Sequence, residues 1–287
     1  MTGAGGGALG AAVSVAAVLG PERAALLELL AGLTDEQWSL PTPCPAWSVH
    51  ELAVHLLHDD LRRLSGDRDG HVGPWIDAAD LDALVVALDR VNEHWVATMA
   101  PTLSPRLTRE LLEWSSRPTE AHLLGSDPLA AGRSVAWAGP GAHPNWLDVA
   151  REYTERWVHQ QQLRDAVGRP GLTDEAFAGP VVDTFARALP AALPPAHGPA
   201  SAVTVTVTGS FVRTWTFVGD TVGWRFANTP VPADTHVAVP VEVFWRRAVR
   251  MLDRPTTERA TCHAGDPVLV DAVLDVRAAI VGERPPR

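Results

Sequence analysis

Apolar residues recur every three or four positions through most of the first two thirds of the chain, and this spacing is typical of amphipathic helices. It predicts five helices, which cover residues 21–33, 49–64, 81–99 and 145–167, with a further helix that Thr173 caps. Residues 100–144 are rich in proline, glycine and isolated tryptophans. We therefore expect them to form a long ordered excursion between the third and fourth helices, not a linker.

The start of the second helix has the sharpest local signal. Ser48 is followed three residues later by Glu51. A serine and a glutamate at this spacing form a capping box, in which each side chain binds the backbone N–H group of the other residue. We therefore expect the helix to begin at Val49.

The pattern changes after the proline-rich residues 189–201. Valine and threonine alternate in AVTVTVT, and two further short runs, FVRTWTFV and VGWRFA, are bounded by Gly, Asp or Asn. These runs predict a β-meander, and residues 240–252 and 267–281 predict helices packed on it. The expected fold class is α+β, with a helical domain over 1–188 (1–12 disordered), a linker over 189–201 and a smaller α+β domain over 202–287.

Composition narrows the choice of function. The net charge of −10 and the absence of any basic run argue against a nucleic-acid partner. All 24 basic residues are arginine, which excludes Schiff-base and phosphate-loop lysines. The two cysteines, Cys44 and Cys262, are too few for a disulfide scaffold and fit a reducing cytoplasm. The apolar run near the N-terminus has no positive residue before it and is too short to span a bilayer, so we expect neither a signal peptide nor a membrane span.

Glu155 and His159 lie four residues apart on the predicted helix 145–167, so both can reach one metal ion. A third ligand has to come from another segment. The candidate is His55, with His58 as the alternative, because His50 points to a different face of its helix. Two histidines and one carboxylate suit zinc or a similar divalent ion and leave a coordination position open.

A solvated helix face explains the same pattern without a metal. Asp148, Glu152 and Gln162 fall on the same arc as Glu155 and His159, opposite the aromatic side of the helix. Helical spacing alone does not decide between the two readings.

Two strings of residues make the chain similar to a known family. TPCPAWSVHELAVHL (residues 42–56) and the Glu155/His159 helix that ends in RDAVGRP (residues 164–170) resemble the mycothiol-dependent maleylpyruvate isomerase family. A weaker similarity covers GDPVLVDAVLDVR (residues 265–277). The resemblance implies a DinB-like four-helix bundle followed by a sterol-carrier-like α+β domain.

The resemblance also implies the ligands and the chemistry. The family's metal, usually taken as zinc, would be held by His55, Glu155 and His159 and would bind the thiol of mycothiol. The implied enzyme is a cytoplasmic isomerase or thiol transferase that acts on a small unsaturated or electrophilic acid, as a monomer or small homo-oligomer without membrane contact. An arginine of the second domain, Arg213 or Arg225, would hold the substrate carboxylate. Gln162 departs from the family, whose members often have an acidic residue there.

A binding protein is the alternative function. The same two domains could hold a metal or an apolar ligand without turnover. Metal content, followed by thiol-dependent turnover, separates this function from the enzyme.

Overall fold

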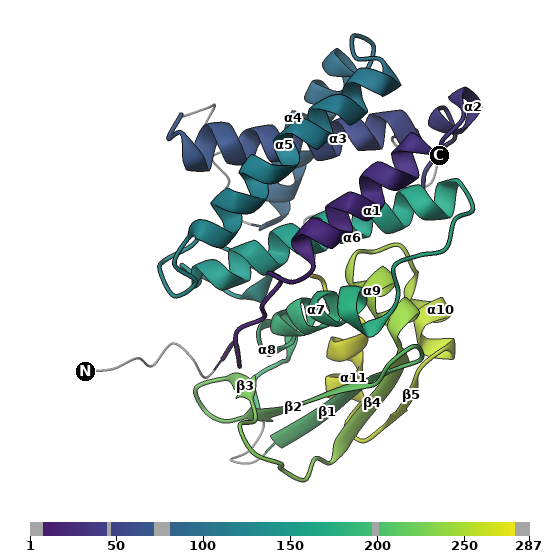
Figure 1. Ribbon diagram of the computed structural model, residues 1–287. Coiled ribbons are helices and arrows are strands. Elements are labelled where there is room, and N and C mark those ends of the chain that lie inside the picture. The colour runs from purple at the N-terminus through teal and green to yellow at the C-terminus, as the bar shows by residue number, and fades with distance from the viewer. Residues whose placement is uncertain (1–7, 45–46, 72–80, 197–200, 279–287) are drawn as a thin grey trace. The chain divides into compact units, whose positions relative to one another are not determined.

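The computed structural model describes residues 8–44, 47–71, 81–196 and 201–278 (Figure 1). Contacts divide the chain into two compact units. The described part of the helical unit is residues 15–44, 47–71, 81–130 and 152–172, and that of the sheet unit is residues 8–14, 131–151, 173–196 and 201–278. Because these units group residues by contact, the sequence-based domains 1–188 and 202–287 stay a prediction.

Two parts of the predicted domain scheme fall partly outside the described residues. Of the segment 1–12, expected to be disordered, residues 8–12 are described, and Leu9 in it is buried. Residues 1–7 lie outside the description. Of the predicted linker 189–201, residues 197–200 lie outside it, and a short helix begins at Leu189.

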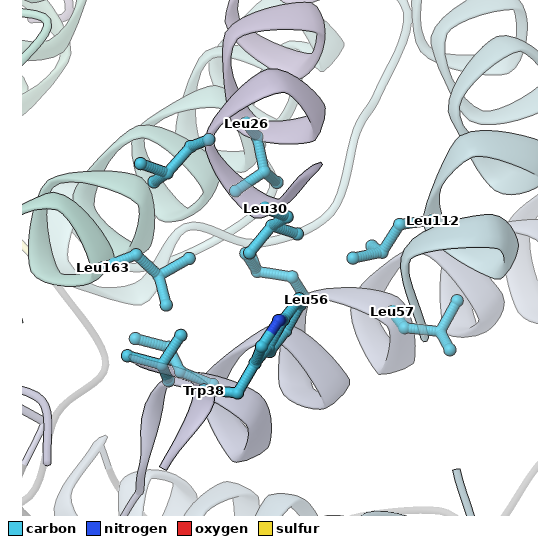
Figure 2. Close-up of a cluster of buried hydrophobic side chains, with 11 residues drawn as sticks. Leu26, Leu30, Trp38, Leu56, Leu57, Leu112 and Leu163 are labelled. Atoms are coloured by element: carbon cyan, nitrogen blue, oxygen red, sulfur yellow. The ribbon is translucent and has the colours of Figure 1, made fainter. Parts of the chain in front are cut away.

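The helical unit has a leucine-rich core that several helices share. Its elements are α1 (Leu19–Ala31), α2 (Asp35–Trp38), α3 (Val49–Arg62), the π-helical turn η1 (Arg63–Arg68), α4 (Leu81–Met99), α5 (Pro105–Gly125) and the part of α6 (Asn145–Ala166) from residue 152 on. Figure 2 shows Leu26 of α1, Leu56 of α3, Leu112 of α5 and Leu163 of α6 around one centre, together with Trp38. Burial of each such side chain adds about 1.5–3 kcal/mol to the free energy of unfolding. This core therefore holds α3 against α6.

The predicted capping box at the start of α3 is confirmed. The backbone N–H of Ser48 donates to Glu51 Oε2 at 2.7 Å, and the backbone N–H of Glu51 donates to Ser48 Oγ at 3.4 Å. The first turn of α3 is therefore fixed, and with it the direction of every side chain further along the helix.

Residues 100–144 contain a long helix that the sequence analysis did not predict. Ser104 caps α5, Pro105 occupies its first turn, and Pro118 lies inside it. The internal proline and the many polar residues hide the helical period, because the buried face of α5 alternates leucine with hydroxyl residues. That face consists of Thr108, Leu112, Ser115, Thr119 and Leu123.

Several helix ends differ from the predicted ones. The fifth predicted helix, α7 (Glu175–Phe185), is capped by Asp174 and not by Thr173, since the Asp174 carboxylate accepts from the N–H of Phe177 at 3.1 Å. The first helix begins at Leu19, two residues before the predicted start. The second predicted helix, α3, ends at Arg62, two residues before the predicted end, and η1 continues it with a wider turn.

The sheet unit is built on one mixed sheet. Its strands are β1 (Ser201–Thr208), β2 (Arg213–Gly219), β3 (Trp224–Phe226), β4 (Thr235–Pro240) and β5 (Cys262–Ala264), in the order β3-β2-β1-β4-β5. The predicted meander is confirmed as antiparallel β1, β2 and β3, while β4 pairs parallel to β1. β4 and β5 were not predicted, and the α+β class is confirmed.

Alternation along β1 determines which face of the sheet is buried. Val203, Val205 and Val207 are fully buried. On the opposite face Thr204 pairs with the opposing Thr216 through hydroxyl groups 3.1 Å apart. The valine face is therefore the core face of the sheet.

Short helices complete the sheet unit. They are the 3-10 turn η2 (Ala136–Ala138), α7, the 3-10 turn η3 (Ala186–Ala188), α8 (Leu189–Ala192), α9 (Val241–Ala248), α10 (Arg254–Arg259) and α11 (Pro267–Leu274). Of these, α8, α9 and α11 contact strands of the sheet (Figure 1). The two predicted C-terminal helices are present but shorter than expected, and residues 279–281 of the second prediction lie outside the described part. Among the described residues, no helix combines the length and apolar character that crossing a lipid bilayer requires.

Candidate metal centre

Two helices of the helical unit bring the predicted ligands together. His55 lies on α3, and Glu155 and His159 lie one turn apart on α6. The rings of His55 and His159 meet edge to face, with centroids 4.8 Å apart and planes at 87°. Two imidazoles from segments far apart in sequence are therefore within reach of one ion, which helical spacing alone did not establish.

Gln162 fixes the His159 ring. The Nδ1 atom of His159 lies 2.8 Å from Gln162 Oε1, and because a carbonyl oxygen only accepts, Nδ1 carries the proton. In the neutral form of the ring the lone pair is then on Nε2, which lies 3.9 Å from Glu155 Oε2. This nitrogen and this oxygen are on the same side of α6 and present two metal-compatible donor atoms together.

His55 is buried in an aromatic and polar environment. Its ring lies 4.7 Å from the Trp47 ring, its Nδ1 has no hydrogen-bond partner, and Nε2 is 3.4 Å from Asp59 Oδ2. Burial holds the pKa of His55 well below its usual value, and the neighbouring His159 and Arg62 lower it further. The ring is therefore neutral at pH 7, the form in which imidazole binds a metal.

Two further residues of α3, His58 and Asp59, lie beside His55. One donor atom from each of His55, His58 and Asp59 falls within 4.8 Å of the other two. His58 stacks on Trp95 with ring centroids 4.5 Å apart, and burial lowers its pKa to about 4. Burial raises the pKa of Asp59, and the charge of Glu152 raises it further.

The sequence analysis named His58 only as an alternative and did not name Asp59. The signal for Asp59 was present, since it stands four residues after His55, the same spacing that singled out Glu155 and His159. The family motif has a single ligand on this helix, so the resemblance did not point to Asp59.

The polar arc of α6 is not a solvated face. Glu152 is buried, and its Oε2 accepts from Arg63 Nε at 2.9 Å, while Arg156 Nη2 lies 3.4 Å from its Oε1. Asp148 and Gln162 are buried as well. The interpretation of this arc as a solvated surface is therefore wrong. Buried polar groups need partners inside the protein, and the arginines supply them for Glu152.

The donor set fits a divalent cation. It offers the neutral His55 ring, the His159 ring and nearby carboxylate groups, and one buried nitrogen of His55 has no partner. Nitrogen and oxygen donors of this kind suit zinc and neighbouring divalent metals. Glu152 is not a free donor, because two arginines already bind it.

His50 is in a different environment from His55, as the sequence analysis expected. Its Nε2 lies 3.1 Å from the hydroxyl of Thr108 on α5, and its ring contacts Trp38 edge to face. A substitution at His50 is therefore a natural control for one at a metal ligand.

The two arginines that the sequence analysis assigned to a substrate carboxylate belong to the sheet unit. Arg213 on β2 lies 3.2 Å from Glu175 Oε1 and 3.7 Å from Asp183 Oδ2. Arg225 on β3 is half exposed and lies 3.9 Å from Asp220. Each arginine already has a carboxylate neighbour in its own unit.

Comparison with known proteins gives a family match over the helical region. The family described as mycothiol maleylpyruvate isomerase N-terminal domain matches residues 19–164, just over half of the 287-residue chain. The matched segment contains all the metal-binding candidates.

Two curated relatives are uncharacterized proteins of Mycobacterium tuberculosis. Rv0036c of strain H37Rv and MT0041 of strain CDC 1551 are each 31% identical over 143 residues, which is 49% of this chain and 51% of the relative. The match thus spans about half the length of these relatives.

A solved structure supports the fold. The crystal structure of a histidine-to-alanine mutant of the mycothiol-dependent maleylpyruvate isomerase superposes with a TM-score of 0.50, covering 88% of this chain and 92% of that one. The sequences are 11% identical, so this similarity concerns the fold alone.

Proposed function

This chain belongs to the mycothiol maleylpyruvate isomerase family, and from that premise we propose that it binds a divalent cation through His55, Glu155 and His159. We propose further that the cation activates a low-molecular-weight thiol, mycothiol, for reaction with a small unsaturated or electrophilic acid. Zinc is the proposed metal, since two histidines and a carboxylate are a common zinc set with one position left for another ligand.

The single observation that supports this proposal is the edge-to-face meeting of His55 and His159, with Glu155 one turn away on α6. The contacts within the protein leave one nitrogen of each ring available to a metal. His159 donates from Nδ1 to Gln162, and His55 has a buried Nδ1 without a partner. Leaving a polar nitrogen buried and unpartnered costs about 1–3 kcal/mol, a cost that a metal–ligand bond removes.

A bound divalent cation lowers the pKa of a coordinated thiol, so that the thiolate nucleophile is present at neutral pH. The chain's own residues prepare this site in three ways. Gln162 orients His159 and holds its proton on Nδ1. Trp47 packs on His55 and keeps water from that side of the ring. Arg63 binds Glu152 and balances its charge.

The reaction is proposed as isomerisation or thiol transfer, and both begin with attack of a thiolate on an electrophilic carbon. Arg213 or Arg225 is proposed to bind the substrate carboxylate, since guanidinium binds carboxylate in a bidentate manner. Arg213 would have to exchange Glu175 for the substrate, and Arg225 would have to leave Asp220.

The proposed enzyme works in the cytoplasm as a monomer or small homo-oligomer. The small number of cysteines supports the location, because Cys44 and Cys262 do not form a disulfide.

The test is metal analysis of the purified protein, followed by turnover of maleylpyruvate with mycothiol and without thiol. We expect one divalent ion per chain and activity only when thiol is present. Protein without metal would overturn the proposal as a whole. Bound metal without thiol-dependent activity, on maleylpyruvate and on a general electrophile, would overturn the catalytic part alone.

A specific observation favours a second candidate, a metal-binding protein without turnover. His58 and Asp59 place two extra donors beside His55. If these donors join the cation, its coordination is complete and no position remains for a thiol, which is the arrangement of a structural site. This candidate would be supported by purified protein that contains the metal but does not bind thiol.

A further inference from the structure

A cavity of about 670 Å³ lies within the sheet unit. Its walls come from residues 10–14, from α7, from η3 and from β2 and β3 with the residues that follow β3. Ligand pockets in proteins commonly have volumes of about 300–1,000 Å³, so the cavity is large enough for a small organic molecule. None of the candidate metal ligands lines it.

A buried arginine, Arg187, lines the cavity, and the charge of Asp183 on the preceding turn acts on it. Arg187 is 5% exposed. Its two terminal nitrogens donate to the carbonyl oxygens of Asp183, at 2.5 Å, and Ala11, at 2.7 Å, while Nε has no hydrogen-bond partner. Within the described residues, no carboxylate lies at salt-bridge distance from this guanidinium, although buried charges are normally paired.

Aromatic rings surround the guanidinium where an acidic side chain would be expected. The central carbon of the Arg187 guanidinium lies 4.7 Å from the centroid of the Phe226 ring and 6.0 Å from that of Trp146. Burial lowers the pKa of Arg187 to about 10, so the group still carries its charge at neutral pH. A buried cation of this kind attracts an anion from solution.

The acidic groups of the cavity are engaged with other side chains. The Asp183 carboxylate accepts from Trp215 Nε1 at 2.8 Å and lies 3.7 Å from Arg213. Glu175 lies 3.2 Å from Arg213. Both carboxylates thus face Arg213, and neither lies at salt-bridge distance from the Arg187 guanidinium.

We propose that this cavity binds a small organic carboxylate, with its carboxylate group at Arg187 and its apolar part against Trp215 and Phe226. The unpartnered Nε–H group of Arg187 suits a single carboxylate oxygen, whereas a phosphate dianion would need a second cation. The apolar part has a surface to cover, because Val13, Pro180 and the two aromatic rings also line the cavity.

The experiment is isothermal titration calorimetry of the full chain with 1-naphthoate as the probe and the neutral 1-naphthamide as its matched control. We expect naphthoate to bind once per chain. A hydrogen-bonded charge pair makes binding tighter by about tenfold to hundredfold, so naphthamide is expected to bind more weakly by that factor. Equal binding of the acid and the amide would overturn the proposal.

Three variants assign the binding to the cavity. Arg187→Gln is expected to weaken naphthoate binding at least about tenfold, Arg187→Lys to weaken it less because the charge remains, and Arg259→Gln to leave it unchanged. Arg259 is an exposed arginine of α10 in the same unit and does not line the cavity. Unchanged binding in Arg187→Gln would contradict the proposal.

A fourth variant tests the proposal even if Arg187→Gln does not fold. Ala176 is an exposed residue in the first turn of α7 and lines the cavity, so Ala176→Trp fills part of it without touching the buried core. We expect weaker naphthoate binding with an unchanged melting temperature. Naphthoate that binds Ala176→Trp as tightly as it binds the native chain, or that no longer binds after a chelator removes metal, would place the probe elsewhere and overturn the assignment.

Discussion

The His55 ring on α3 and the His159 ring on α6 lie 4.8 Å apart, with their planes almost perpendicular. The leucine core that α3 and α6 share sets this distance, since Leu56 and Leu163 both belong to it. The metal proposal therefore depends on ordinary hydrophobic packing that brings two histidines together. Five predictions follow from it and from the buried charges around it.

Gln162 is predicted to tune the metal affinity through His159. Gln162→Ala removes the acceptor of the Nδ1 proton, so the ring loses its fixed orientation and part of its basicity. Loss of such an outer partner typically weakens metal binding about tenfold to hundredfold. Zinc affinity measured by competition with a chromophoric chelator checks this. Gln162→Glu, which keeps the acceptor, should bind zinc at least as tightly as the native chain, and an equal loss in both variants would contradict the role of Gln162.

Asp59 is predicted to act as a neighbour of His55 and not as a ligand. Its Oδ2 lies 3.4 Å from His55 Nε2, so Asp59→Asn should leave the number of ligands unchanged. Visible absorption of the cobalt-substituted protein measures this, because the d–d bands respond to the number and geometry of ligands. Unchanged bands in Asp59→Asn, beside altered bands in Glu155→Gln, are the expected result. Altered bands in Asp59→Asn would instead support the closed site of the second candidate function.

Glu22 on α1 is predicted to destabilise the chain as the pH rises. Burial raises the pKa of Glu22 above its ordinary value of 4.5, in spite of the opposing charge of Arg23, and its Oε2 has no partner. The unfolded chain therefore releases this proton at a lower pH than the native chain, and the free energy of unfolding falls as the pH rises above about 4.5. Glu22→Gln should remove this loss, so its stabilising effect should be near zero at pH 4 and grow toward pH 8 in urea denaturation.

Glu36 offers a control of opposite sign. It is an exposed residue of α2, and its hydrogen bond with Thr34 lowers its pKa. Glu36→Gln should therefore lose a little stability at high pH and none at low pH. The same pH trend in both variants would mean that general charge effects, and not burial of Glu22, cause the change.

Asp60 is predicted to be a main electrostatic contact of the helical unit. It is fully buried and accepts from Arg23 at 3.0 Å, from Arg156 at 2.9 Å and from Ser115 at 2.5 Å. Asp60→Ala leaves two buried arginines without this anion, and breaking a buried ion pair in this way costs about 3–5 kcal/mol. Chemical denaturation measures the loss. The exposed pair of Arg106 and Glu110 on α5 is the control, and Glu110→Gln should leave the denaturation midpoint almost unchanged.

Local signals in the sequence predicted much of the helical unit. Ser48 and Glu51 predicted the start of α3 correctly because a capping box depends only on neighbouring residues. The helix over Leu81–Met99 has the predicted bounds, because its apolar residues recur at helical spacing. Helix α5 was missed because Pro118 and the hydroxyl residues on its buried face break the apolar period.

Features that depend on tertiary contacts were less predictable. β4 pairs parallel to β1, and a parallel pair leaves no turn signal between its strands. The α6 arc looked solvated because a helical wheel shows which residues share a face but not what covers it. Glu152 is buried there because Arg63 and Arg156 neutralise it. Arg63 is far from Glu152 in the sequence, and no motif marks Arg156 as its partner.

The candidate ligands were predictable by type but not by distance. Four-residue spacing placed Glu155 and His159 on one face, and the resemblance to a family singled out His55. Spacing within one helix carries no information on the gap between α3 and α6. The four-residue spacing of His55 and Asp59 was visible in the sequence, whereas the unpartnered Nδ1 of His55 became visible only in the structure.

The metal content of His159→Ala, compared with that of His50→Ala, tests the central claim most directly. Both variants remove a half-buried histidine of the helical unit, but only His159 lies against His55 and Glu155, whereas His50 contacts Thr108. Plasma emission spectrometry of the two proteins, purified side by side, should find about one divalent ion per chain in His50→Ala and almost none in His159→Ala. Equal metal in both variants would contradict the proposed site and, with it, the proposed activity.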